Sequence, residues 1–173
     1  MFIPPTPKLN LGSLFSGPVV SLAESFIDNC IRDMVQPVPG SVLYCDLGPV
    51  PGHTVEHTGI YIGNNQIVHL DGSGLIEVVS PAEFLARLDG FNTAISIYVS
   101  SRNGEAVGCD SVAERAREMI GMTRKYNVIL DNCHQFTAGC LTGDFENANN
   151  FFWMVKDTAK EVLGANEWRV WEG

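Results

Sequence analysis

The sequence predicts a single α+β domain of 173 residues, and three patterns support this prediction. Short runs rich in β-branched and aromatic residues crowd the interval from residue 41 to residue 99. Runs with helical spacing lie before and after that interval. No internal repeat, low-complexity tract or linker divides the chain. We therefore expect one antiparallel sheet packed against helices, with one domain over residues 1–173.

Five short segments are the expected strands. Gly63, Asn64 and Asn65 separate two of these segments, which is a strong signal for a β-hairpin. The predicted strands are Ser41–Cys45, Thr58–Ile62, Gln66–Leu70, Leu75–Val79 and Ala94–Val99.

Helices are expected on both sides of these strands. Residues 1–17 are rich in proline and glycine and predict an irregular arm, after which residues 19–34 place apolar side chains at helical spacing. Ser80, Pro81 and Glu83 form the capping-box pattern that opens a helix to about Leu88. Three more helices are predicted, one capped by Asp110 and closed by Gly121, one capped by Asp131-Asn132 and ended by Thr142-Gly143, and a C-terminal one over residues 148–164.

The composition is ordinary for a globular protein, with 45% hydrophobic and 18% charged residues. The net charge of −9 repels phosphate backbones, so we expect no nucleic-acid partner. Five cysteines without a C-x-x-C pair fit neither a disulfide framework nor a zinc ribbon. Neither a signal peptide nor an apolar run of about 18 residues is visible. These features predict a soluble, cytoplasmic protein with no cofactor and no integral membrane segment, and they leave peripheral membrane contact and the oligomeric state open.

Two of the four histidines lie in the stretch PGHTVEHTGIYIG, where His53, Glu56 and His57 have the spacing of one class of zinc proteases. A zinc helix would need both rings on one helical face. Pro51-Gly52 and Gly59 enclose the motif too closely for a stable helix, and the following Ile-Tyr-Ile favours an extended chain. We therefore place His57 at the start of a strand and His53 in a loop, and we expect no metal site.

The register of the hairpin decides which side chains share a face with His57. A two-residue turn over Asn64-Asn65 would put His57 and His69 on opposite faces. A three-residue loop with a bulge places Gly59 opposite His69 and makes His57 its diagonal neighbour. Burial favours this second register, because it collects the apolar residues on one face, namely Ile60, Ile62, Val68 and Leu70.

A cysteine is the expected partner of the two histidines. Gly59 leaves room for a close approach on their face, and we expect Cys133 to be the group that approaches. Cys133 lies in the first turn of a capped helix, where free N–H groups and the helix dipole favour the thiolate. The alternative is a small buried hydrophobic residue, the commonest state of a free cysteine. The core is expected to hold Cys30, Cys45 and Cys140, and Cys109 is the weaker candidate nucleophile.

These segments resemble, in order and spacing, the motifs of the lecithin retinol acyltransferase-like family, a circularly permuted branch of the papain-like (NlpC-type) thiol hydrolases. The resemblance covers about residues 37–143, and the matching segments are Gly40–Val42, Glu56–Gly63, Ile67–Leu70 and Tyr126–Phe136. It implies a permuted papain-like fold, in which an antiparallel sheet packs against helices that include the nucleophile helix, with the catalytic core over residues 37–143.

The same resemblance implies roles for individual residues. Cys133 would be the nucleophile, His57 the general base, and His69 would orient His57 where papain-like enzymes usually carry an asparagine. The backbone N–H of Cys133 would donate to an oxyanion. Tyr61 and Asn132 are further candidates for contacts to the substrate or the oxyanion, with simple packing favoured for Tyr61. No cofactor is implied.

Two features depart from the family pattern. His134 follows the nucleophile where the family carries an acidic residue, and we expect it to point away from Cys133 to the surface or to a supporting position. The segment ending in Trp168–Trp171 carries no membrane anchor. We favour an enzyme that forms an acyl-Cys133 intermediate on an acyl lipid or ester. Two alternatives stay open, a cysteine peptidase or amidase on peptide, isopeptide or cell-wall substrates, and a non-catalytic interaction module that docks a partner through residues 19–34 or Phe151–Trp153.

Overall fold

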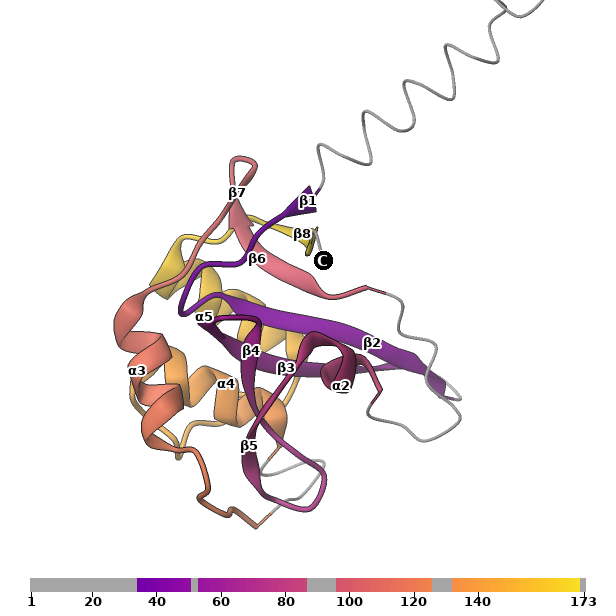
Figure 1. The fold of residues 1–173 in the computed structure, drawn as a ribbon, viewed down its shortest axis with the longest axis vertical. Coiled ribbons are helices and arrows are strands. Elements are labelled where there is room, and N and C mark those ends of the chain that lie inside the picture. Colours follow the sequence, from indigo (N-terminus) through magenta and orange to yellow (C-terminus); the bar gives the residue numbers. More distant parts are fainter. Residues whose placement is uncertain (1–33, 51–52, 87–95, 126–131, 172–173) are drawn as a thin grey trace, which may run out of the picture. The chain divides into compact units, whose positions relative to one another are not determined.

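A mixed sheet of eight strands organises the computed structural model (Figure 1). The structure describes residues 34–50, 53–86, 96–125 and 132–171, so the predicted arm, residues 19–33 of the first predicted helix, Cys30 and the segment 126–130 lie outside the described residues. The strand order is β1-β8-β6-β2-β3-β4-β5, with β7 paired to β6. Every pairing is antiparallel except that of β1 with β8. The predicted α+β class is confirmed.

The bounds of the elements are as follows. The strands are β1 (Met34–Val35), β2 (Val42–Val50), β3 (His53–Gly63), β4 (Gln66–Leu70), β5 (Ile76–Val79), β6 (Tyr98–Arg102), β7 (Glu105–Ala106) and β8 (Glu167–Trp171). The helices are α2 (Pro81–Leu85), α3 (Asp110–Glu118), α4 (Cys133–Thr142) and α5 (Phe152–Leu163). Within the described ranges, none of the helices combines the length and the apolar character needed to cross a bilayer.

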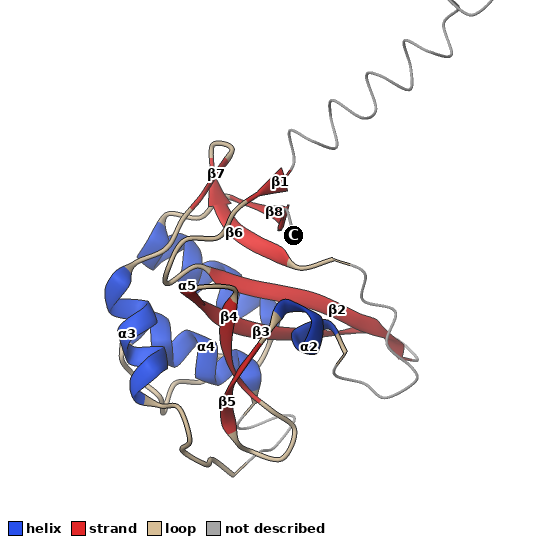
Figure 2. Ribbon diagram, in the orientation of Figure 1, coloured by secondary structure: helices blue, strands red, loops and turns tan. Residues whose placement is uncertain are grey.

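The sheet separates two apolar clusters. On one face, strand residues such as Ile60 and Val68 pack against α3, α4 and α5, which contribute Val112, Phe136 and Val155 among others. The opposite face is covered by α2, whose Phe84 packs in a second cluster with Leu43, Cys45, Tyr61, Ile67 and Val99. Figure 2 shows α3, α4 and α5 gathered on one side of the sheet and α2 apart from them. The alternation of side chains along β3 and β4 therefore decides which cluster each residue enters.

The β3–β4 hairpin has the predicted pairing but not the predicted turn. Ile60 pairs with Val68, which is the register that puts His57 and His69 on one face. The turn itself contains only Asn64-Asn65, with φ angles of 54° and 55° that are typical of a type I′ turn. The extra residue lies within β3, where the register shifts just before the turn. A β-bulge in the strand thus produces the register that we expected from a three-residue loop.

The predicted caps of α2 and α4 agree with the structure, whereas that of α3 does not. Ser80 and Glu83 make both hydrogen bonds of the capping box at the start of α2. Asn132 caps α4 so that Cys133 is its first residue, and Gly143 ends this helix with a φ of 85°. At α3 the N-cap is Cys109 rather than Asp110. The hydrogen bonds of the Asn132 cap therefore place Cys133, the nucleophile candidate, at the start of α4.

Other predicted boundaries are wrong. Met34 lies in β1 rather than in a helix, and His53 lies in β3 rather than in a loop. β6 begins at Tyr98, later than predicted, and α5 lies within the predicted range but starts at Phe152, which leaves Phe151 exposed. β8 was not predicted, because its pairing with β1 and β6 joins segments that are far apart in the sequence.

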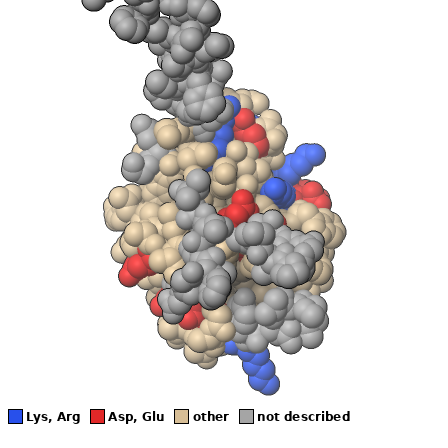
Figure 3. Space-filling view, turned by 90° about the vertical axis from the view of Figure 1, so that its right-hand side faces the viewer, with Lys and Arg blue, Asp and Glu red and all other residues tan. Residues whose placement is uncertain are grey.

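Charged side chains of both signs lie on the face drawn in Figure 3, among larger areas of uncharged residues. The chain as a whole carries a net charge of −9. On the described part of this face, the acidic excess does not form one continuous acidic surface.

Candidate active site

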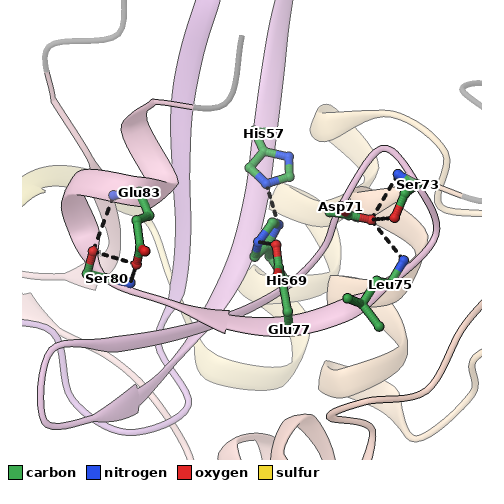
Figure 4. Close-up of polar contacts among 8 residues, drawn as sticks. All are labelled: His57, His69, Asp71, Ser73, Leu75, Glu77, Ser80 and Glu83. Carbon is green, nitrogen blue, oxygen red and sulfur yellow. Dashed lines mark hydrogen bonds and ion pairs between the residues drawn. The ribbon is translucent and has the colours of Figure 1, made fainter. Parts of the chain in front are cut away.

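Two buried histidines meet on the face of the sheet that carries α2. His57 in β3 is 7% exposed and His69 in β4 is fully buried. The two rings are nearly perpendicular, and His57 Nε2 lies 2.8 Å from His69 Nδ1 (Figure 4). Cys45 of β2 pairs with His57 from the other side. The rings therefore form one hydrogen-bonded pair inside the sheet layer.

Cys133 lies against His57 at the start of α4, with 4% of its surface exposed. Burial by itself raises the pKa of the Cys133 thiol. The charge of His57 and a hydrogen bond with its ring act in the opposite direction, as do hydrogen bonds with the backbone and hydroxyl of Thr58. The pKa of Cys133 is lowered below its ordinary value as a result. These contacts stabilise the thiolate, which is the nucleophilic form of cysteine.

Asn132 holds the first turn of α4 in place. Its side-chain oxygen accepts hydrogen bonds from the backbone N–H groups of His134 and Gln135, at 3.0 and 3.2 Å. Its amide nitrogen donates to the carbonyl oxygen of Asn150 at 2.8 Å. Both ends of the Asn132 amide thus serve the helix start, which fixes the position of Cys133.

The other described cysteines differ from Cys133. Burial raises the pKa of Cys45 to about 12, helped by the charges of Cys133 and Asp46, and burial also raises the pKa of Cys140. Cys109 is exposed, and its pKa is lowered by hydrogen bonds with Ser111. The described residues contain no group of three or more His, Cys, Asp or Glu side chains that could hold a metal ion. Of the two cysteines with a lowered pKa, Cys133 is the one in contact with His57.

The sequence model described as lecithin retinol acyltransferase matches residues 41–146, which is more than half of the chain. The chain belongs to the lecithin retinol acyltransferase family. Membership supports an enzyme with acyltransferase or hydrolase activity in the broad sense, and the α+β architecture is consistent with a papain-like fold of this family. A comparison with individual curated proteins finds no match.

A carboxylate that the sequence analysis missed lies beside the histidine pair. Glu77 in β5 is the direct cross-strand partner of His69. Glu77 Oε1 lies 3.5 Å from His69 Nε2, as Figure 4 shows. The alternation of β5 could have placed Glu77 on the face of His69, but only if the register across the preceding turn had been known.

Phe84 occupies the space beside Gly59. The prediction that Cys133 would approach Gly59 is therefore wrong. A Cβ atom at Gly59 would lie 3.1 Å from Phe84 Cε2. The Phe84 ring lies 4.9 Å from the His57 ring and 5.9 Å from the His69 ring, between centroids. Cys133, the first residue of α4, instead contacts β3 at His57 and Thr58.

His134 is buried and contacts Cys133, so the predictions that it points away from Cys133 and lies at the surface are wrong. The alternative, a supporting position, agrees with its contacts. Its Nδ1 atom lies 3.2 Å from the Thr58 hydroxyl and 3.9 Å from Cys133 Sγ. The ring stacks on Phe152 at 6.0 Å between centroids. Burial lowers the pKa of His134 to about 4, with the charge of Glu56 opposing this effect. His134 is therefore neutral near pH 7.

Tyr61 shares the histidine face, but its hydroxyl has a structural partner. It accepts a hydrogen bond from the backbone N–H of Asn65 at 3.3 Å, and its ring packs edge-on against Trp171. Tyr61 lies four positions along β3 from His57, a distance of about 13 Å. This geometry favours simple packing for Tyr61 and lends no support to an oxyanion contact.

Proposed function

We propose that the protein is a thiol-dependent acyltransferase or hydrolase that works through an acyl-Cys133 intermediate, with an acyl lipid or ester as the donor. The observation that carries the proposal is the contact of Cys133 with His57, which lowers the pKa of the thiol. His57 in turn is hydrogen bonded to His69 at 2.8 Å. Membership of the lecithin retinol acyltransferase family supports the choice of an acyl donor.

The chemistry follows from these contacts. The Cys133 thiolate attacks the carbonyl carbon of the donor while His57 holds the proton that left the thiol. The backbone N–H of Cys133, at the start of a helix, donates to the oxyanion of the tetrahedral intermediate. When the bond to the leaving group breaks, His57 returns the proton to that group and a thioester remains on Cys133.

The second half of the reaction releases the acyl group. Water or an acceptor hydroxyl attacks the thioester carbonyl and gives its proton to His57. The carbon–sulfur bond then breaks, which releases the acid or the new ester and restores the thiolate beside the imidazolium ring. Whether water or an alcohol is the acceptor decides between hydrolysis and acyl transfer.

Intact-mass spectrometry tests this proposal. The protein is incubated with phosphatidylcholine vesicles or a short activated ester and quenched in acid, and the mass of one acyl group is expected on the wild-type chain. Cys133→Ala and His57→Gln should lose the adduct. Cys109→Ala is the matched control and should keep it, because the pKa of Cys109 is also lowered, but by hydrogen bonds with Ser111 rather than by His57.

Two outcomes would contradict the proposal. An adduct that persists in Cys133→Ala would assign the nucleophile to another cysteine. If none of the esters acylates the wild-type chain while peptide or isopeptide bonds are cleaved in a Cys133-dependent way, the protein is a peptidase or amidase rather than a lipid-acting enzyme.

A further inference from the structure

Either His57 or His69 can be the donor in the hydrogen bond that joins them, and the choice decides whether His57 can act as a base. A neutral imidazole has one N–H donor and one acceptor nitrogen. If His57 Nε2 carries the proton and donates to His69 Nδ1, then His57 Nδ1 is free to take a proton from Cys133. If His69 Nδ1 donates instead, His57 carries its proton on Nδ1 and is not a base on that side. The tautomer of His69 therefore decides whether His57 is competent.

The carboxylate of Glu77 favours one of these tautomers. An ionised carboxylate only accepts hydrogen bonds, and Glu77 Oε1 lies 3.5 Å from His69 Nε2. With the His69 proton on Nε2, facing the carboxylate, His69 Nδ1 becomes the acceptor for His57 Nε2–H at 2.8 Å. We propose that Glu77 is a positioning residue of this site, which acts through His69 to hold His57 in the tautomer that accepts the Cys133 proton.

The fold holds Glu77 in this position from both sides (Figure 4). Before β5, Asp71 Oδ1 accepts hydrogen bonds from the backbone N–H and hydroxyl of Ser73 and from the N–H of Leu75, at 2.7 to 2.9 Å. After β5, the Ser80 capping box starts α2. The turn fixes the register in which His69 faces Glu77, and α2 brings Phe84 onto the two rings.

The charge of Glu77 has a second consequence. When His57 takes the proton from Cys133, it becomes a cation, and the negative charge of Glu77 on the far side of His69 stabilises it. His69 is fully buried, which limits screening on the inner side, whereas the Glu77 side chain is 33% exposed. Loss of this charge should therefore disfavour the thiolate–imidazolium pair by a moderate amount.

The pH dependence of Cys133 reactivity reports on the linked groups Cys133, His57, His69 and Glu77. The other titratable groups that face it are Cys45 from β2, with a pKa of about 12, and His134 from α4, with a pKa of about 4. Neither changes its charge between pH 5 and 8. From α2 the contact is the uncharged ring of Phe84.

The test compares Glu77→Ala and Glu77→Gln with wild type by the rate of Cys133 alkylation with iodoacetamide, read by peptide mapping from pH 5 to 8. In Glu77→Ala we expect the rate at pH 6 to fall about tenfold, which corresponds to one pKa unit. Glu77→Gln should lie between the two, because its amide oxygen still accepts the His69 proton. Glu105→Gln removes an exposed carboxylate of β7 and should match wild type.

A second readout follows the tautomer itself and does not depend on catalysis. Nitrogen-15 shifts of the two rings should show the wild-type His57 protonated on Nε2, and a mixture of tautomers in Glu77→Ala. Unchanged shifts and an unchanged pH profile in both folded variants would overturn the inference, with folding checked by circular dichroism.

This inference rests on the proposed function, but the two can fail separately. If Cys133 of the wild type alkylates at pH 6 no faster than an ordinary thiol, the proposed function fails, and the nitrogen shifts still decide the role of Glu77. If the wild type is reactive and both Glu77 variants equal it, only the role of Glu77 is wrong.

Discussion

The ring of Phe84 fills the place that a side chain at Gly59 would take. A Cβ atom at Gly59 would lie 2.9 Å from Ile67 Cγ2, 2.9 Å from the carbonyl oxygen of Val68 and 3.1 Å from Phe84 Cε2. Because Phe84 also contacts the rings of His57 and His69, the missing side chain at Gly59 lets α2 close over the histidine pair.

Gly59→Ala should therefore damage the site without touching its polar atoms. The added methyl group meets a backbone oxygen that cannot move away cheaply, so we expect a loss of about 1–3 kcal/mol in the free energy of unfolding. Displacement of Phe84 should also lower the rate of acyl transfer. Urea unfolding measures the first effect, and the acylation rate measured in urea-free buffer measures the second.

Gly72→Ala is the matched control for this change. Apart from its two chain neighbours, no residue places a heavy atom within 4 Å of a Cβ at Gly72, which is exposed. Its free energy of unfolding should stay within about 0.5 kcal/mol of wild type, and its acylation rate should be unchanged. Equal behaviour of the two alanine variants would show that the space beside Gly59 is not filled as described.

The four described cysteines should alkylate in two classes at pH 7. Cys133 and Cys109, whose pKa values are lowered, should react in the folded protein. Cys45 and Cys140 should react only after unfolding, because both are buried and their pKa values are raised. Iodoacetamide labelling with peptide mapping separates the four sites.

Two substitutions separate the causes within the reactive class. His57→Gln should slow the labelling of Cys133 and leave Cys109 unchanged, since His57 lowers the pKa of Cys133. Ser111→Ala should slow the labelling of Cys109 alone, because it removes the side-chain hydrogen bond that contributes most to lowering the pKa of Cys109. If His57→Gln leaves Cys133 as reactive as before, the imidazole does not activate the thiol.

The hydroxyl of Thr58 should contribute to the acidity of Cys133. Thr58→Val removes a group that hydrogen bonds Cys133 and also contacts His134 and Thr137. We expect the Cys133 pKa to rise by about half a unit, which slows alkylation at pH 6 by about threefold. Thr58→Ser keeps the hydroxyl and should retain the wild-type profile. A wild-type profile in Thr58→Val would mean that only the Thr58 backbone matters.

Acid should destabilise the fold through His134. Its pKa is about 4 in the folded protein and 6.5 as an unperturbed histidine. Below pH 6.5 the unfolded chain therefore binds a proton that the folded chain does not, so stability is lost as the pH falls towards 4. Between pH 7 and pH 5 this effect amounts to about 2 kcal/mol. Urea unfolding at each pH measures it.

His134→Asn is the comparison that isolates this effect. The asparagine side chain can still hydrogen bond with the Thr58 hydroxyl but does not titrate. The variant should lose less stability than wild type between pH 7 and pH 5, and His57 and His69 are the same in both chains. Parallel pH curves for the two proteins would rule out a buried neutral His134.

Local signals were enough to predict the elements that carry the nucleophile candidate. Asn132 before Cys133, and the Ser80–Glu83 capping box, were both recognised because a cap is made by residues within three positions of each other. The hairpin parity was also predictable, because burial allows only one face to hold the apolar residues of β3 and β4. The predicted turn was wrong because a bulge in the strand and a three-residue loop give the same alternation of side chains between the two faces.

What the sequence alone determined was thus the α+β class, the start of the nucleophile helix and the common face of His57 and His69. Only the tertiary structure decided that Phe84 lies beside Gly59, that Glu77 faces His69 and that His134 is buried behind Cys133. It also decided the pairing of β8 with β1 and β6. These contacts join separate elements, and their strength comes from shared burial rather than from any pattern within one segment.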